Sequence, residues 1–182
     1  MPESLDFHGF RLWYRVNMED ITVPDAAESI KWYVLGMRNQ RALRVAAGMA
    51  ACGFECFVPP KITNLLFVHA LRTEIDSYLT YNKLGLHLYY VRSKTDSQPI
   101  VVRDKDMTNF ILICKESDVP IIMTEPPTMK LGDSVRVTDG PLRGVEGRIV
   151  RIRKQKRILV NVGEHIWAAT AYVKPEYLEI LK

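Results

Sequence analysis

The chain has 182 residues and a mass of 20.9 kDa, a size that suits one large domain or two small ones. With 47% apolar and 25% charged residues and a net charge of +4, a packed globular protein is expected rather than a disordered one. No apolar run reaches the roughly 18–20 residues of a membrane span, and the N-terminus lacks a secretory signal. The three cysteines are too few for a disulfide scaffold, so we expect a cytoplasmic protein without membrane association.

Residues 1–29 form an acidic N-terminal extension, with six acidic and two basic side chains. Residues 10–16 within it are strand-like, and Pro24 and Asp25 separate the extension from the first domain. This stretch either pairs at a sheet edge or stays mobile, and the sequence leaves both alternatives open.

Strands and helices alternate in residues 30–115. The predicted strands are rich in β-branched and aromatic residues and cover residues 32–35, 54–59, 65–71 and 86–91, with a short extended piece at 99–102. In the third strand, Leu65 and Phe67 lie on one face and Leu66 and Val68 on the other.

Three helices are predicted in the same region. The first covers residues 39–52 and ends at Gly53. The second opens at Thr73, with Asp76 completing a capping box, and the third starts at 103 or 104. The order β-α-β-β-α-β-α predicts an α+β domain, a split-βαβ antiparallel sheet with helices on it.

The remaining chain has a different pattern. Residues 116–130 contain three prolines and indicate an interdomain linker. Residues 131–182 contain five short alternating stretches and no helix, at 134–138, 145–152, 158–162, 166–172 and 177–181. They predict a small SH3-like β-barrel as a second domain.

The sequence lacks the motifs of common catalytic and metal sites. HExxH, CxxC and GxxxxGK[ST] are all absent. Cys52 and Cys56 have no second pair of zinc ligands nearby, so structural thiols are expected. We therefore expect no enzyme activity, no catalytic residue, no metal and no other cofactor.

Glycines mark the beginning of the second domain. Gly140, Gly144 and Gly147 stand between two alternating strands, where each permits a backbone bend that a Cβ would obstruct. In this loop, Leu142 and Val145 either cap the end of the barrel or form a patch that docks a partner. Residues 131–157 resemble the KOW motif.

The first domain also resembles a known one. The residues Trp32-Tyr33-Val34, 53–59, 64–68 and 85–91 are similar to the NGN domain. NGN followed by KOW is the arrangement of the NusG family of bacterial transcription elongation factors, and the resemblance covers residues 30–182. Residues 62–65 depart from the usual NGN pattern, which favours the specialised RfaH-like or UpxY-like antiterminators, the latter tied to surface-polysaccharide operons.

The resemblance implies binding to RNA polymerase through the NGN domain, with suppression of pausing or termination. By motif position, the polymerase-binding residues would be Leu65, Phe67, Tyr90, Met107 and Phe110. Ordinary core packing is the alternative for each, because strands and amphipathic helices need such residues in any case.

A basic series begins the first helix. Its spacing of three places Arg38, Arg41 and Arg44 on one flank. The resemblance implies contact with the non-template DNA strand, for which arginines suit phosphate and stacking contacts. A solvated face is the alternative.

The KOW domain of this family recruits a second partner, a ribosomal protein or the termination factor Rho. The resemblance places Leu142, Val145 and Val162 at this contact. A KOW-containing ribosome- or RNA-binding protein is the alternative function, because residues 143–157 carry seven basic side chains against Glu146 alone. We expect a monomer whose domains fold independently, with an autoinhibited packing of the two as the alternative.

Overall fold

The computed structural model describes residues 29–38, 40–60, 62–81, 87–116, 121–123, 132–152, 155–162, 166–170 and 172–181. The chain divides into two compact units, Met1–Arg92 and Ser93–Lys182, called the N-terminal and C-terminal units below. The strand predicted at residues 10–16 lies outside the described residues.

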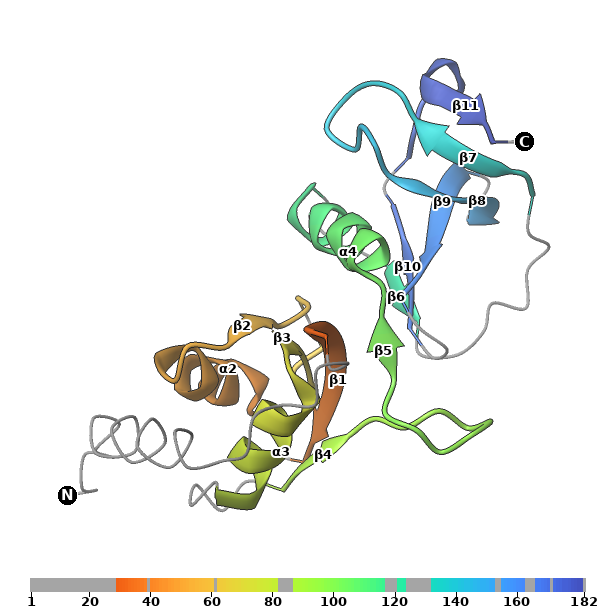
Figure 1. Ribbon diagram of the computed structural model, residues 1–182. Coiled ribbons are helices and arrows are strands. Elements are labelled where there is room, and N and C mark those ends of the chain that lie inside the picture. Colours follow the sequence, from red (N-terminus) through yellow and green to blue (C-terminus); the bar gives the residue numbers. More distant parts are fainter. Residues whose placement is uncertain are drawn as a thin grey trace. The chain divides into compact units, whose positions relative to one another are not determined.

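The N-terminal unit is built on an antiparallel sheet with the strand order β2-β3-β1-β4 (Figure 1). Its strands are β1 (Lys31–Met37), β2 (Glu55–Phe57), β3 (Leu65–Ala70) and β4 (Leu88–Tyr90). In the register of this sheet, Val34 pairs with Phe67, and Leu35 pairs with both Leu66 and Tyr90. Paired residues share a face of the sheet, so the register fixes which side chains meet.

Two helices cover one face of this sheet, α2 (Ala42–Ala51) and α3 (Arg72–Tyr81). The core beneath them combines alternate residues of the strands with the apolar sides of both helices. Its largest members are Tyr33, Leu35, Met37, Val45, Met49, Phe54, Leu66, Val68, Ile75, Tyr78 and Tyr90. Leu66 and Val68 belong to this core, as the predicted alternation along the strand requires.

The end of α2 follows the prediction at Gly53. This residue has φ +98°, which favours glycine, and its N–H donates to the carbonyl of Ala50. The N–H of Phe54 donates to the carbonyl of Met49, and both of these side chains enter the core. The two bonds and the apolar contact form a Schellman motif, which satisfies carbonyls that the helix end leaves free.

The start of α3 differs from the predicted capping box of Thr73 and Asp76. The helix begins at Arg72, and the Glu74 carboxylate accepts a hydrogen bond from the Leu71 N–H at 3.0 Å. Asp76 instead accepts a hydrogen bond from the Tyr90 hydroxyl. The capping carboxylate is thus two residues earlier than expected, because the helix begins at Arg72, which makes Leu71 the N-cap and Glu74 the third helical residue.

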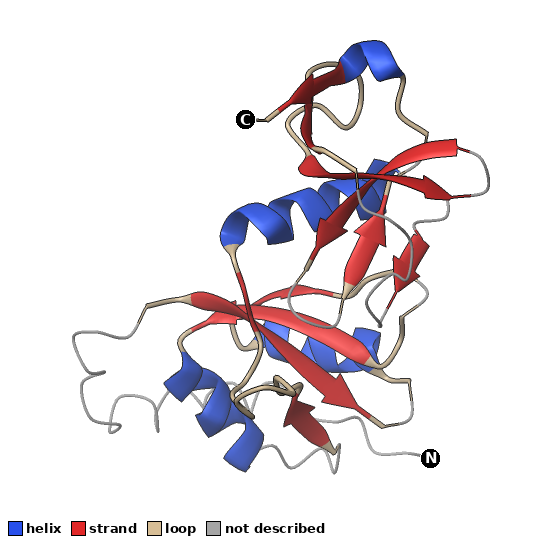
Figure 2. Ribbon diagram, turned by 90° about the vertical axis from the view of Figure 1, so that its right-hand side faces the viewer, coloured by secondary structure: helices blue, strands red, loops and turns tan. Residues whose placement is uncertain are grey.

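The C-terminal unit contains a six-stranded antiparallel sheet with the order β11-β7-β8-β9-β10-β6. Figure 2 draws the strands of both units in red and the helices in blue. Its strands are β6 (Ile121–Met123), β7 (Ser134–Val137), β8 (Glu146–Ile152), β9 (Gln155–Asn161), β10 (Trp167–Ala169) and β11 (Leu178–Ile180). The short strand β5 (Val101–Val102), the helix α4 (Asp104–Glu116) and a 3₁₀ turn (Pro175–Tyr177) complete the unit.

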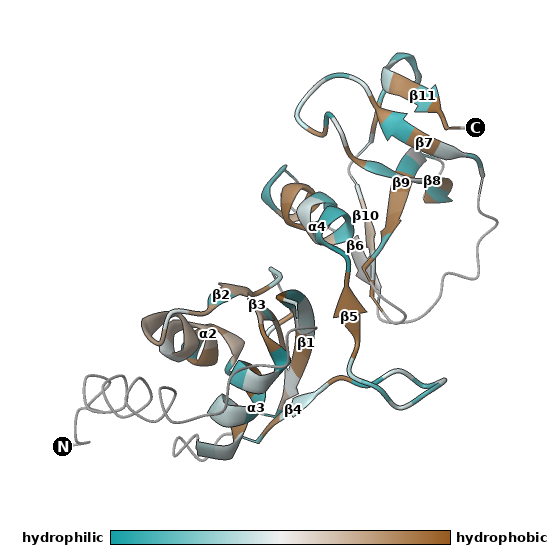
Figure 3. Ribbon diagram, in the orientation of Figure 1, coloured by the Kyte–Doolittle hydropathy of each residue, from teal (hydrophilic) through white to brown (hydrophobic). Residues whose placement is uncertain are grey.

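Apolar and polar residues alternate along β7 (Figure 3). Val135 and Val137 are buried, whereas Ser134 and Arg136 are exposed. Val150, Leu159 and Ala169 form a core cluster of this sheet. Gly147 lies where β8 and β9 approach closely, because a Cβ there would stand 2.4 Å from the carbonyl oxygen of Leu159.

The structure confirms the α+β fold class, with two antiparallel sheets and three described α-helices. Each of the five stretches predicted in residues 131–182 also overlaps a strand, although β9 begins three residues before the predicted stretch 158–162. No helix among the described residues is long and apolar enough to cross a membrane.

The division into units differs from the predicted domains 30–115 and 131–182. It falls between Arg92 and Ser93, so that α4 belongs to the C-terminal unit. Part of the predicted linker, Ile121–Met123, is a strand paired with β10, whereas residues 117–120 and 124–131 lie outside the described residues. Periodicity identifies a helix or strand but does not say which sheet it joins, because that depends on contacts distant in sequence.

Candidate functional site

The residues predicted to bind polymerase do not lie on one surface. Phe67 pairs with Val34, and Tyr90 pairs with Leu35, so Phe67 and Tyr90 lie on opposite faces of the N-terminal sheet. Leu65 shares the face of Phe67 and is half-buried. Phe67 is buried, with its ring centroid 6.4 Å from that of Phe57.

Tyr90 has a core environment. Its hydroxyl donates to Oδ1 of Asp76 at 2.9 Å, and its ring meets that of Tyr33 edge-on at 5.9 Å. Burial raises the pKa of Tyr90, and the hydrogen bond to Asp76 raises it further. This tyrosine therefore ties β4 to α3 and is part of the core of the N-terminal unit.

Met107 and Phe110 are buried residues of α4, in the C-terminal unit. The helical repeat places them on the side of α4 away from Lys105 and Asn109, which face the C-terminal sheet. The five predicted residues are thus divided between two faces of one sheet and a helix of the other unit.

The three arginines of the basic series are exposed at the beginning of α2. Arg38 follows β1, Arg41 precedes the helix, and Arg44 lies in its first turn. That turn has no acidic residue and Arg41 makes no side-chain cap, although negative charge is what stabilises a helix N-terminus. Positive charge at this end is unfavourable for the helix itself. It raises the local positive potential, which attracts polyanions.

Arg38 also lines a hollow of about 450 Å³ together with His87, Leu88 and Tyr89. Tyr89 is 50% exposed. Neither His87 nor Tyr89 was among the predicted site residues.

The residues predicted to contact a partner of the KOW domain are buried: Leu142, Val145 and Val162. The loop around Leu142 turns at Gly140 and Gly144, both with positive φ, and the Gly144 N–H donates to the Val137 carbonyl at 2.8 Å. In this loop Leu142 is 7% and Val145 is 0% exposed, so both side chains point inward.

A smaller hollow of about 270 Å³ lies beside Leu142. Its lining includes Pro141, Tyr172 and Tyr177, and Tyr172 is 52% exposed. Tyr172 is the last residue of the predicted strand 166–172. At a strand end the alternation of apolar and polar residues does not show whether a tyrosine is exposed or buried, so the sequence indicates no role for it.

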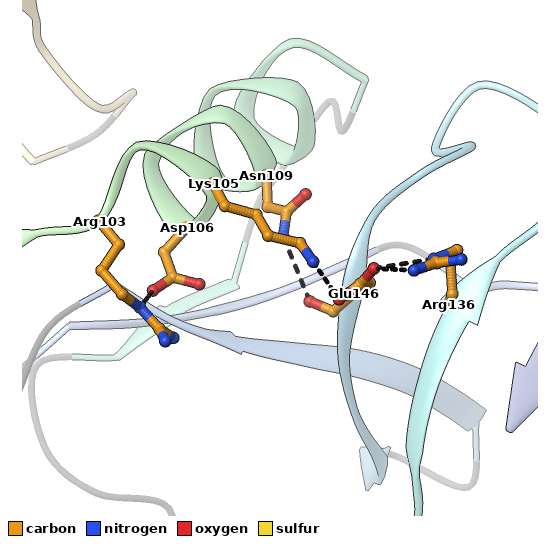
Figure 4. Close-up of polar contacts among 6 residues, drawn as sticks. All are labelled: Arg103, Lys105, Asp106, Asn109, Arg136 and Glu146. Atoms are coloured by element: carbon orange, nitrogen blue, oxygen red, sulfur yellow. Dashed lines mark hydrogen bonds and ion pairs between the residues drawn. The ribbon is translucent and has the colours of Figure 1, made fainter. Parts of the chain in front are cut away.

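Glu146 connects three elements of the C-terminal unit (Figure 4). One carboxylate oxygen lies 2.6 Å from Nζ of Lys105 on α4, and the other lies 2.7 Å from Nη2 of Arg136 on β7. Nδ2 of Asn109 donates to the main-chain carbonyl of Glu146 at 3.4 Å. Hydrogen bonds from Lys105 and then Arg136 lower the pKa of Glu146, because both favour the charged form.

The sequence contains one signal for this contact. Residues 143–157 contain seven basic residues and a single acidic one, Glu146. Its position there suggests a specific partner, but the sequence does not show that Lys105, far away in the chain, is one of them.

The cysteines have the character of structural thiols. Burial raises the pKa of Cys56 to about 12 and that of Cys114 to about 12, which suppresses the nucleophilic thiolate. Within the part of the chain that the structure describes, no three His, Cys, Asp or Glu side chains are grouped to hold a metal ion.

Comparison with known proteins gives one family match: residues 131–161 match the KOW motif. A search of curated proteins finds no match to this chain. A solved structure concerned with domain interaction in Thermotoga maritima NusG is similar to it, with 15% identity and a TM-score of 0.46. That similarity covers 85% of this chain and 98% of the other.

Proposed function

We propose that this chain is a transcription elongation and antitermination factor of the NusG type. It binds RNA polymerase through its N-terminal domain, suppresses pausing or termination, and recruits a ribosomal protein or Rho through its KOW domain. It acts in the cytoplasm as a non-catalytic monomer. The observation that supports this most is the order of its parts: an antiparallel α+β sheet with two helices on one face, followed by a KOW motif.

Within this type, we place the chain with the specialised RfaH-like and UpxY-like paralogues, with surface-polysaccharide operons as the proposed targets. The support is the acidic extension before the first domain and the unusual residues 62–65. Such paralogues act on chosen operons, which requires a contact with nucleic acid in addition to polymerase.

The proposed polymerase surface is the sheet face that carries Leu65 and Phe67, with Met107 and Phe110 as further contacts. Tyr90 belongs to the proposed set as well, although it packs under α3 from the opposite face of the sheet. Phe67, Met107 and Phe110 are buried, so their contact with polymerase requires a rearrangement that exposes them. Leu65 is partly exposed and is the residue of this set to test first.

The mechanism is a population shift. A protein that binds the processive state of polymerase better than the paused state raises the processive population by the ratio of its two affinities. No covalent chemistry is needed, which agrees with a chain whose sequence offers no recognisable nucleophile.

A second candidate is a KOW-containing ribosome- or RNA-binding protein. The observation that favours it is the exposure of Arg143, Arg148 and Arg151 in the basic segment 143–157. It predicts stoichiometric co-sedimentation with ribosomes, which salt would weaken.

Affinity purification of the tagged chain from its own cells tests the two candidates together. Recovery of RNA polymerase subunits at near-equal amounts supports the first. Recovery of whole ribosomal subunits without polymerase contradicts it and supports the second.

A further inference from the structure

The hollow beside Arg38 combines a cation with an open aromatic ring. Arg38, His87, Leu88 and Tyr89 line it, and none of the four is acidic. Its volume of about 450 Å³ falls within the roughly 300–1,000 Å³ typical of sites for small molecules. Arg38 is exposed, and half of the Tyr89 side chain remains open.

The ring of Tyr89 lies against the backbone of its neighbouring strand. Gly36 pairs with Tyr89 across β1 and β4, and a Cβ at Gly36 would stand 2.6 Å from Cε2 and 2.8 Å from Cζ of the ring. The ring thus occupies the space that a side chain at position 36 would need. A ring positioned in this way loses little freedom when a ligand stacks on its open side.

A flat ring beside an arginine is the combination that recognises an unpaired nucleotide. Bases of every sequence stack on aromatic side chains, and a guanidinium pairs with the phosphate. A duplex does not offer the face of a base in this way, since its bases are stacked on each other.

We propose that Tyr89 is a stacking platform for an unpaired base of single-stranded DNA and that Arg38 contacts the adjoining phosphate. The inference rests on the proposed function and deepens it, because the non-template strand is unpaired within a transcribing polymerase. It adds Tyr89 to the DNA contact that the resemblance implies for Arg38, Arg41 and Arg44.

The test measures how tightly the purified full-length chain binds a fluorescein-labelled single-stranded DNA of about 12 nucleotides, within the roughly 4–16 nucleotides of such sites. Fluorescence anisotropy follows binding at several salt concentrations. Tyr89→Ala should weaken binding about 5- to 150-fold, the range for losing one stacked base. Tyr89→Phe keeps the ring and should bind within about twofold of the unchanged protein.

Salt dependence separates the two roles. Arg38→Ala should lower the slope of log affinity against log salt by about 0.7, the value for one phosphate contact on a single strand. Tyr89→Ala should leave that slope unchanged, because stacking releases no counterion.

Two further variants control for folding and position. Tyr89→Leu keeps an apolar side chain over Gly36 but has no flat ring, so it should weaken binding as Tyr89→Ala does. Tyr172→Ala removes a tyrosine of similar exposure in the C-terminal unit and should bind normally. Normal binding by Tyr89→Leu, or equal weakening by Tyr172→Ala, would overturn the proposal.

Competitors and a parallel capture experiment complete the test. Unlabelled single-stranded DNA should displace the probe, whereas equal displacement by duplex DNA, or tenfold tighter binding of single-stranded RNA, contradicts the assignment. Capture of RNA polymerase by the same variants is measured separately. If Tyr89→Ala binds single-stranded DNA normally while the unchanged chain captures RNA polymerase, the stacking site alone is overturned. If the unchanged chain does not capture RNA polymerase, the proposed function is overturned.

Discussion

Tyr89 and Tyr90 are neighbours on β4 with opposite environments. Tyr89 is 50% exposed, whereas Tyr90 is 9% exposed and donates its hydroxyl proton to Asp76. The alternation of a strand makes this contrast necessary, since successive side chains point to opposite faces. It decides which tyrosine is available to a ligand and which supports the fold.

Tyr90→Phe should therefore lower the free energy of unfolding by about 1–2 kcal/mol, because it removes a hydrogen bond to a carboxylate that then loses a partner. Tyr89→Phe should change it by less than about 0.5 kcal/mol, as exposed substitutions do. Urea denaturation of both variants measures the difference. Equal stability of the two would contradict the core role of Tyr90.

Gly147 gives a second test at a single position. Its missing side chain leaves room for the Leu159 carbonyl, 2.4 Å from where a Cβ would stand, and for Cγ2 of Ile158 at 2.7 Å. Gly147→Ala should lower the stability of the C-terminal unit by about 1–3 kcal/mol, since backbone must move to admit the methyl group. Gly132→Ala, where the nearest atom is at 3.2 Å, is the control and should have a smaller effect.

The contact between α4 and the C-terminal sheet depends on Glu146. Two cations lower its pKa below the ordinary value of 4.5, so the stabilisation is fully present above about pH 4.5. It is lost as the pH falls through the lowered pKa of the folded protein, when the carboxylate is protonated.

Glu146→Gln should consequently speed amide hydrogen exchange in α4 at neutral pH, and the loss of protection below about pH 4.5 should be smaller than in the unchanged chain. Glu176→Gln, at an exposed carboxylate 3.7 Å from Lys174, should leave exchange in α4 unaffected. An unchanged pH profile in Glu146→Gln would show that this carboxylate does not hold the helix.

The basic series at the start of α2 leads to a prediction about salt. Replacing Arg38, Arg41 and Arg44 together by Ala should lower the slope of log affinity for single-stranded DNA against log salt by up to about 0.7 per lost contact. Arg143→Ala, an exposed arginine of the C-terminal unit, should leave the slope as it is. A loss of slope in Arg143→Ala alone would instead favour the basic segment 143–157 as the nucleic-acid surface.

Local patterns predicted the helices and strands well because their causes are local. Gly53 ends α2 through its own positive φ, and the alternation of β3 places Leu66 and Val68 in the core. The capping box was misplaced by two residues because α3 begins at Arg72, so that Glu74 rather than Asp76 reaches the N–H of the N-cap residue, Leu71. Distant contacts also decide whether the apolar residues of α4 and of the loop around Leu142 are core or surface. Periodicity carries no information about such contacts.

The two units of the chain differ in how much the sequence says about their roles. The KOW motif of residues 131–161 is matched directly, so the character of the C-terminal region rests on its own residues. The proposed role of the N-terminal unit rests on the order of its strands and helices. The central claim therefore concerns the N-terminal domain and its action on polymerase.

An elongation assay with purified RNA polymerase tests this claim most directly, by measuring the half-life of a defined pause with and without the full-length chain. The chain should shorten the pause, and Leu65→Asp should lose this effect while keeping its circular dichroism spectrum, because a charge would stand on the proposed polymerase surface. Tyr172→Ala, in the other unit, should remain active. An unchanged pause half-life at saturating concentrations of the folded chain would contradict the account.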